Sequence, residues 1–125
     1  MLNQAVGLLG RVLLSAIFLW AGFNKAISPD ATIASFTKLS VANPPLAYTV
    51  TLAVELLAGA AVLVGWKTRC AALALAIWCG VTALAVHYHP GDRGQMLHFM
   101  KNLCMAGGFL QLFVLGGGRF SLDRR

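Results

Sequence analysis

The stretch that most constrains the fold of this chain is residues 49–65, an apolar segment with one acidic residue at its middle. A helix that spans a bilayer needs about 20 mostly apolar residues, so this segment has most of the length of one. No other residue of the segment offsets the charge of Glu55. A carboxylate at the centre of a span costs about 2.5–3.5 kcal/mol on insertion scales. We therefore expect Glu55 to face a partner side chain or a cavity and not lipid.

The composition agrees with a membrane protein. Of the 125 residues, 58% are hydrophobic and only 11% are charged, whereas a soluble domain carries roughly 25% charged residues. A soluble fold of this size leaves much of its surface exposed and could not bury so much apolar area. The sequence thus predicts an all-α membrane protein.

Four apolar stretches are long enough to be spans. They cover about residues 4–23, 46–64, 70–88 and 99–115. We predict a four-transmembrane-helix bundle that forms a single integral membrane domain over residues 1–125. The first stretch follows no basic segment and precedes no cleavage site of small residues, so we expect it to be a retained helix and not a signal peptide.

The connection between the first two spans, residues 26–45, contains a helical pattern. Ser28 precedes Pro29, as at the start of many helices, and Ile33, Phe36 and Leu39 recur at three-residue spacing. This pattern predicts a short interfacial helix that lies on the bilayer surface. An irregular loop with a few apolar side chains is the alternative.

The net charge of +6 is concentrated in loops and tails. Both termini and the turn after the second span would share one side of the membrane, because the number of spans is even. That side carries five basic residues: Lys67, Arg69, Arg119, Arg124 and Arg125. The opposite side has fewer: Lys25, Lys38 and Arg93, with Lys101 just inside the last span. The positive-inside rule therefore predicts a multi-pass membrane protein with both termini cytoplasmic. Nucleic-acid binding is not expected, since no basic stripe has interleaved aromatic residues.

Arg11 is the partner that the sequence favours for Glu55. Counted along the helices at 1.5 Å per residue, the two residues differ in depth by roughly 6 Å, which an arginine side chain can cover. Lys101 and Asn102 would form the upper wall, whereas Lys25 lies too near the surface unless the interfacial helix folds inward. Such a buried ion pair either fixes helix register or forms a pocket for a small ligand, a quinone head group or a proton.

The remaining candidates for redox or metal chemistry are weak. The three cysteines form no CxxC motif. His87, His89 and His98 flank one loop and could meet across the hairpin to bind a metal or haem near the surface. His87 and His89 would lie on different faces of a helix, and their spacing is unspecific. We therefore expect no metal and no haem.

Several motifs follow one another in the order found in a known family: Gly10-Arg11-Val12-Leu13-Leu14, Ala21-Gly22-Phe23-Asn24-Lys25, Glu55-Leu56-Leu57-Ala58-Gly59, Gly65-Trp66-Lys67-Thr68-Arg69, Phe99-Met100-Lys101-Asn102-Leu103 with Gly107-Gly108, and Phe120-Ser121-Leu122-Asp123-Arg124. In this order the chain resembles the DoxX family of small four-helix bacterial membrane proteins. The resemblance implies a polar signature of Arg11, Lys25, Glu55, Lys101 and Asn102. It also implies a location in the bacterial inner membrane and an association with quinol oxidases or thiosulfate:quinone oxidoreductases. The fold is similar to that of vitamin K epoxide reductase-like bundles, whose CxxC motif this chain lacks.

The function predicted from these features is that of an accessory or quinone-interacting subunit of a membrane redox system. We expect no independent catalytic activity, because the sequence has no nucleotide motif and no catalytic triad; a quinone-linked oxidoreductase subunit is the alternative. The sequence shows no evident cofactor, although a quinone is possible, and a redox-enzyme subunit is the expected partner beside the lipid bilayer. Ala72, Ala76 and Gly80 form a small-residue face that serves either internal packing or a homo-oligomer. A small transporter or permeation protein, or a purely structural subunit, is the alternative.

Overall fold

The structure is a computed structural model that describes residues 2–38, 40, 42–88, 90–118 and 120–123. Within these ranges the secondary structure is helical, without β-strands, as predicted. Three helices are long and apolar enough to cross a membrane: α1 (Leu2–Ala26), the helix Pro44–Val64, and the helix Thr68–Ala85. Many of their large apolar side chains face outward, as in Leu13, which is 65% exposed. An all-α membrane protein is therefore confirmed.

The fourth predicted span is present as a helix but is less apolar than the other three. Helix α6 (Arg93–Leu115) has 23 residues, which is long enough to cross a bilayer. It is not among the three apolar spans found in the described part of the chain. Asp92 caps its first turn by accepting hydrogen bonds from the backbone N–H groups of Gly94 and Gln95. A four-span topology thus stays a prediction.

The helix Pro44–Val64 is composite. It begins as α3 (Pro44–Leu52), continues as the π-helical segment η1 (Ala53–Ala58) and ends as α4 (Gly59–Val64). Two prolines occupy its first turn, where their missing N–H groups cost nothing. Gly65 ends it with φ of 75°, a conformation that glycine adopts without a steric penalty. The π-helical segment contains Glu55.

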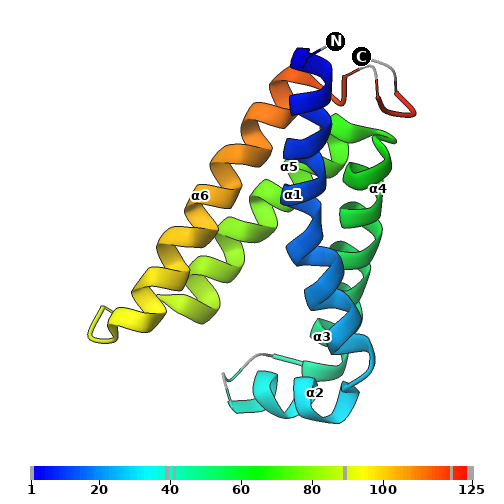
Figure 1. Cartoon of the computed structure of the whole chain (residues 1–125). Helices are drawn as coiled ribbons and strands as arrows, with labels where there is room; N and C mark the ends of the chain where they lie inside the picture. Colours follow the sequence, from blue (N-terminus) through cyan, green and yellow to red (C-terminus); the bar gives the residue numbers. More distant parts are fainter. Residues whose placement is uncertain (1, 39, 41, 89, 119, 124–125) are drawn as a thin grey trace.

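Helix α2 (Pro29–Lys38) lies where the sequence predicted a short helix between the first two spans. It packs against α1 and α3 and crosses the ends of these helices in Figure 1. The intermediate exposure of Ile33 and Phe36 agrees with an amphipathic helix. Leu39, the third residue of the predicted apolar face, lies outside the described residues.

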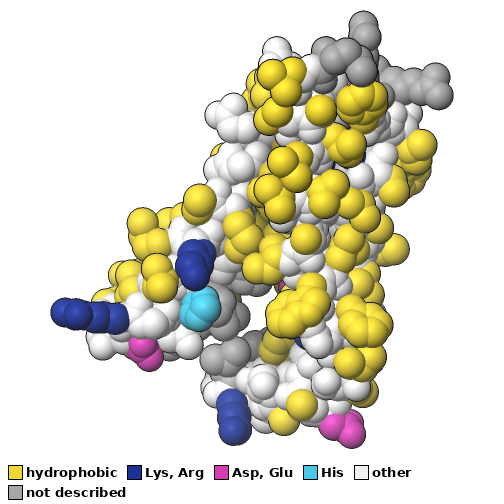
Figure 2. All heavy atoms as spheres, in the orientation of Figure 1, with side chains coloured by type: hydrophobic (Ala, Val, Ile, Leu, Met, Phe, Trp, Pro, Cys, Tyr) yellow, Lys and Arg dark blue, Asp and Glu magenta, His cyan; other side chains and the backbone are white. Residues whose placement is uncertain are grey.

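The long helices form two arms (Figure 1). The first arm contains α1 and the composite helix Pro44–Val64; the second contains α5 (Thr68–Thr82), η2 (Ala83–His87) and α6. The arms meet near the two termini and separate toward the other end, where α2 lies. Figure 2 shows hydrophobic side chains over much of the visible face of both arms. This surface suits lipid contact along the length of the helices.

The apolar core lies where the arms meet. Phe18 of α1 and Phe109 of α6 pack edge to face with ring centroids 5.5 Å apart. Leu75 of α5 and Val62 of α4 are fully buried beside them. Ala72 and Ala76 of the small-residue face are also buried within the chain, whereas a Cβ at Gly80 would meet nothing within 4 Å. The core separates two polar regions, one at each end of the molecule.

Candidate functional site

Glu55 is buried at the first arm, with only 5% of its surface exposed. Its carboxylate accepts two hydrogen bonds from the Lys25 Nζ, which lies 2.9 Å from Oε1 and 2.8 Å from Oε2. The two residues therefore form an ion pair in which one ammonium group binds both oxygens. Glu55 lies in the π-helical segment η1, and such segments are frequent at functional sites.

The predicted Glu55–Arg11 pair is wrong. Side chains on a helix lean toward its N-terminus, so Lys25 at the end of α1 reaches back into the bundle and arrives at the depth of Glu55. For the same reason Arg11 leans away from Glu55, toward the end of the molecule that holds the N-terminus. A depth counted at 1.5 Å per residue describes only the Cα positions, and for this reason it favours Arg11 over Lys25 as the partner of Glu55.

Arg11 instead binds backbone. Its Nη1 donates to the carbonyl oxygens of Val62 and Leu63, each 2.9 Å away, and its Nη2 donates to the carbonyl oxygen of Phe120. The carbonyls of Val62 and Leu63 belong to the last turn of α4, where helical carbonyls lack intrahelical partners. Arg11 thus joins α1, α4 and the C-terminal segment, and its side chain is 1% exposed.

A cavity of about 480 Å³ lies between the arms beside the ion pair. Figure 2 shows a hollow between the arms on the side away from the termini. The wall is largely apolar and comes from both arms and from α2; its residues are Ile17, Phe18, Ala21, Lys25, Ser35, Phe36, Ala47, Thr51, Glu55, Trp78, Val81, Thr82, Ala85, Asn102 and Met105. An ion pair in an apolar, concave wall is the usual composition of a site for a small molecule.

The structure separates the two residues predicted to form the upper wall. Asn102 lines the cavity, whereas Lys101 is exposed and does not line it. Neighbouring residues on a helix point about 100° apart, and the rotation of α6 turns Asn102 toward the cavity and leaves Lys101 on the exposed side. Arg11 is also absent from the cavity wall. The predicted polar core therefore divides into a cavity group of Lys25, Glu55 and Asn102 and two residues that lie elsewhere.

Two close contacts fix the position of the ion pair. Gly22 lies so near η1 that a Cβ at this position would come within 2.8 Å of Leu56 and 3.3 Å of the Glu55 Cβ. The Tyr48 hydroxyl of α3 donates to the carbonyl oxygen of Lys25 at 3.0 Å. The side chain of Lys25 remains 30% exposed, against 7% for Glu55. The ammonium group is thus the more accessible member of the pair.

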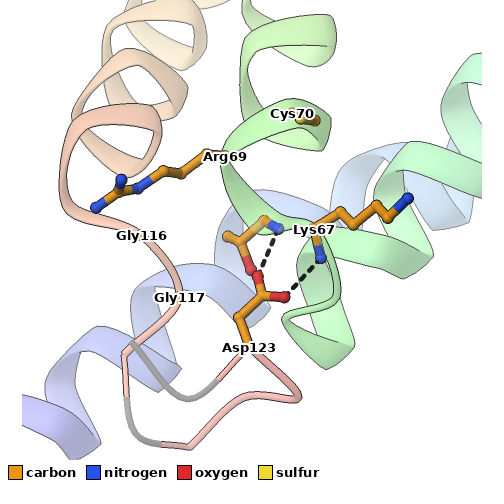
Figure 3. Close-up of a pocket in the computed structure, with 7 residues that line it drawn as sticks. Lys67, Arg69, Cys70, Gly116, Gly117 and Asp123 are labelled. Carbon is orange, nitrogen blue, oxygen red and sulfur yellow. Dashed lines mark hydrogen bonds between the residues drawn. The ribbon is translucent and has the colours of Figure 1, made fainter.

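The second polar region contains a residue that the sequence analysis did not select, Asp123. Its carboxylate accepts hydrogen bonds from the backbone N–H groups of Lys67 and Thr68, at 2.8 and 2.7 Å (Figure 3). It therefore caps the start of α5 from the C-terminal segment. The N–H groups of Leu122 and Asp123 donate to the carbonyl oxygens of Val64 and Gly65. The signal in the sequence was a single acid within a basic tail, which no local capping pattern detects.

The histidine cluster stays a prediction. His89 and the side chain of His87 lie outside the described residues, and His98 is exposed on α6. Among the described residues, no group of three or more His, Cys, Asp or Glu side chains could hold a metal ion.

Comparison with known proteins identifies the family of the chain. The profile of the DoxX family matches residues 6–88. The chain belongs to the DoxX family. The DoxX match extends from α1 to the end of η2 and includes Arg11, Lys25 and Glu55.

Two relatives of this DoxX protein come from Escherichia coli strain K12. It is 32% identical over 123 residues to the inner membrane protein YphA and 33% identical over 117 residues to the inner membrane protein YqjF. Each alignment covers 94% of this chain and 88% of the relative. No solved structure shows significant similarity to the chain.

Proposed function

We propose that this DoxX protein is an accessory subunit of a redox system in the bacterial inner membrane, and that it binds a quinone head group between its two arms. The observation that carries the proposal is the Lys25–Glu55 ion pair in the wall of a largely apolar cavity. A purely structural ion pair gains nothing from a cavity beside it. An intramembrane ionisable pair at a cavity is a functional candidate by default.

The donors of the pair support a ligand with a carbonyl oxygen. An ammonium group has three N–H donors, and two of those of Lys25 are directed at Glu55. The third can donate to a quinone carbonyl, and the Glu55 carboxylate can accept a hydrogen bond from a quinol hydroxyl. Because the pair has no net charge, an uncharged ligand fits the cavity better than a free ion.

The apolar part of the wall supports a ring with a hydrophobic tail. Two aromatic residues line the cavity, Phe36 from α2 and Trp78 from α5. Within the described residues, neither α2 nor α3 packs against α5 or α6. The cavity can therefore open sideways between the arms, and a ligand dissolved in the membrane could enter without crossing water.

The topology in this proposal has α6 as the fourth span and both termini in the cytoplasm. The N-terminus, the C-terminal segment and the turn between α4 and α5 lie at the same end of the molecule (Figure 1), as an even number of spans requires. The basic residues of the turn and tail favour the cytoplasmic side for this end. Both named relatives are inner membrane proteins.

Purification from native membranes in a mild detergent tests the proposal. The eluate is analysed by mass spectrometry for proteins and lipids, and by a UV–visible difference spectrum before and after reduction. We expect a quinone and a redox-enzyme subunit to co-purify with the wild-type chain and with K101Q, which changes a cation outside the cavity. Wild-type protein that retains no quinone and takes up none when it is added would overturn the proposed binding.

A further inference from the structure

An apolar groove lies on the outward face of α4, apart from the cavity between the arms. Its volume is about 410 Å³, and its wall consists of Leu57, Ala60, Ala61, Val64, Trp66 and Leu122. The larger of these side chains remain accessible: Leu57 is 71% exposed and Trp66 is 53% exposed. The alanines form the floor because their side chains are short. The groove follows the helix from Leu57 to Val64, a rise of about 10 Å.

A cation lies at the end of this groove. The Lys67 Nζ is 5.0 Å from the centroid of the Trp66 ring, which lines the groove. Figure 3 shows the Lys67 side chain extending away from Asp123, whose carboxylate faces the backbone of Lys67 and Thr68 instead. Arg69 extends in the opposite direction, past Gly116 (Figure 3). The ammonium group beside the groove is therefore that of Lys67.

We propose that the groove and Lys67 form a binding site for one anionic phospholipid. Its acyl chain lies in the groove along α4, and its phosphate contacts the Lys67 ammonium group. The charges are complementary, and the apolar and cationic parts follow one another in the order of a lipid's chain and head group. Tryptophan is enriched at the level of the head groups, and lysine side chains near helix ends reach toward that level.

A single acyl chain fits this surface better than another helix does. A packed helix needs extended contact along both helices, whereas this groove follows the helix for only about 10 Å and its wall includes the exposed side chains of Leu57 and Leu122. A lysine near an anionic membrane surface contributes binding equivalent to about fivefold in affinity. The site would therefore distinguish anionic from zwitterionic lipids with the same chains. It is independent of the Lys25–Glu55 cavity.

Quenching of tryptophan fluorescence by brominated lipids tests this site. The full chain is reconstituted in phosphatidylcholine bilayers, and brominated phosphatidylglycerol or brominated phosphatidylcholine with identical chains is added. The Trp66 signal is the difference between each protein and the same protein carrying W66F. We expect brominated phosphatidylglycerol to reach half of its maximal quenching of Trp66 at a mole fraction about fivefold lower than brominated phosphatidylcholine does. High salt should reduce this preference through charge screening.

Variants at matched cations decide the role of Lys67. In K67Q, both lipids should quench Trp66 equally. K67R should keep the preference for brominated phosphatidylglycerol, and so should K38Q, which removes a cation from α2. Equal quenching of the wild-type protein by the two lipids would overturn the proposal. A preference that persists in K67Q or is insensitive to salt would do the same, as would a wild-type dimer that shields Trp66 from both lipids. If K67Q does not fold, the salt titration of the wild-type protein decides alone.

Discussion

The two polar regions of this protein satisfy their buried charges in different ways. At the end that holds the termini, Arg11 donates to three carbonyl oxygens and Asp123 accepts from two backbone N–H groups. At the other end, Lys25 and Glu55 bind each other and line a cavity. Charges bound to backbone fix the fold, whereas a side-chain pair beside a cavity retains the capacity to bind a ligand. We assign structure to the first region and binding to the second.

Replacing Arg11 should have the largest effect on stability. R11M leaves carbonyl oxygens of Val62, Leu63 and Phe120 without their donor, and a buried unsatisfied polar group costs roughly 1–3 kcal/mol. We expect a loss of about 3 kcal/mol or more in unfolding free energy, measured by thermal or denaturant unfolding in detergent. K101M, which replaces an exposed cation, is the control. Equal stability of R11M and K101M would contradict a structural role for Arg11.

Adding a methyl group at Gly22 should have the next largest effect. The Cβ of G22A would approach the Leu56 Cδ2 to within 2.8 Å and the Glu55 Cβ to within 3.3 Å, so the Leu56 side chain must move and η1 must shift slightly from α1, at a cost of about 1–3 kcal/mol. G10A is the matched control, because a Cβ at Gly10 meets nothing within 4 Å. This variant should keep or slightly raise stability, since alanine favours helix. A similar loss in both variants would show that the close contact does not hold the ion pair in place.

Removing the carboxylate of Asp123 should have a smaller, local effect. D123A deprives α5 of its cap, which is worth about 1 kcal/mol. Hydrogen exchange should then accelerate at the amides of Lys67 and Thr68. D92A removes the cap of α6 instead and should accelerate exchange at Gly94 and Gln95. Unchanged exchange at the start of α5 in D123A would mean that the C-terminal segment does not dock there.

The smallest effect on stability is expected where both members of the ion pair are replaced together. K25M/E55L leaves no unpaired charge, and such apolar replacements of buried ion pairs are often neutral or stabilising. We therefore expect its unfolding free energy to lie within about 1 kcal/mol of the wild type. The single variant K25M should be less stable than this double variant, because Glu55 is then buried without its partner. The reverse order would contradict this expectation, because Glu55 would then tolerate burial without its partner.

The sequence was sufficient to predict where the helices lie, because the long apolar stretches and the positions of proline and glycine determine where each helix begins and ends. It also contained the correct face of α1. Arg11, Ser15, Phe18 and Gly22 are its buried residues, and Lys25 continues their spacing of three and four residues. This periodicity places Lys25 on the inner face of α1. The depth that its ammonium group reaches depends in addition on the lean of the side chain toward the N-terminus of the helix.

Features that depend on contacts distant in sequence could not be predicted. Asp123 caps a helix that begins 55 residues earlier, so no local pattern reveals its role. The cavity arises because the two arms separate, and no single segment encodes that angle. Lys101 and Asn102 were predicted together because the sequence does not fix the rotation of α6, which places only Asn102 in the cavity wall.

Titration of a short-chain quinone into the purified protein tests the central claim most directly. Binding is measured for the wild type, for K25M/E55L and for the control K101M, after thermal unfolding has established that each is folded. We expect the wild type and K101M to bind the quinone. The folded variant K25M/E55L should bind it at least tenfold more weakly, which corresponds to a loss of about 1.4 kcal/mol of binding free energy. Equal binding by the folded double variant would contradict the assignment of the Lys25–Glu55 pair to ligand binding.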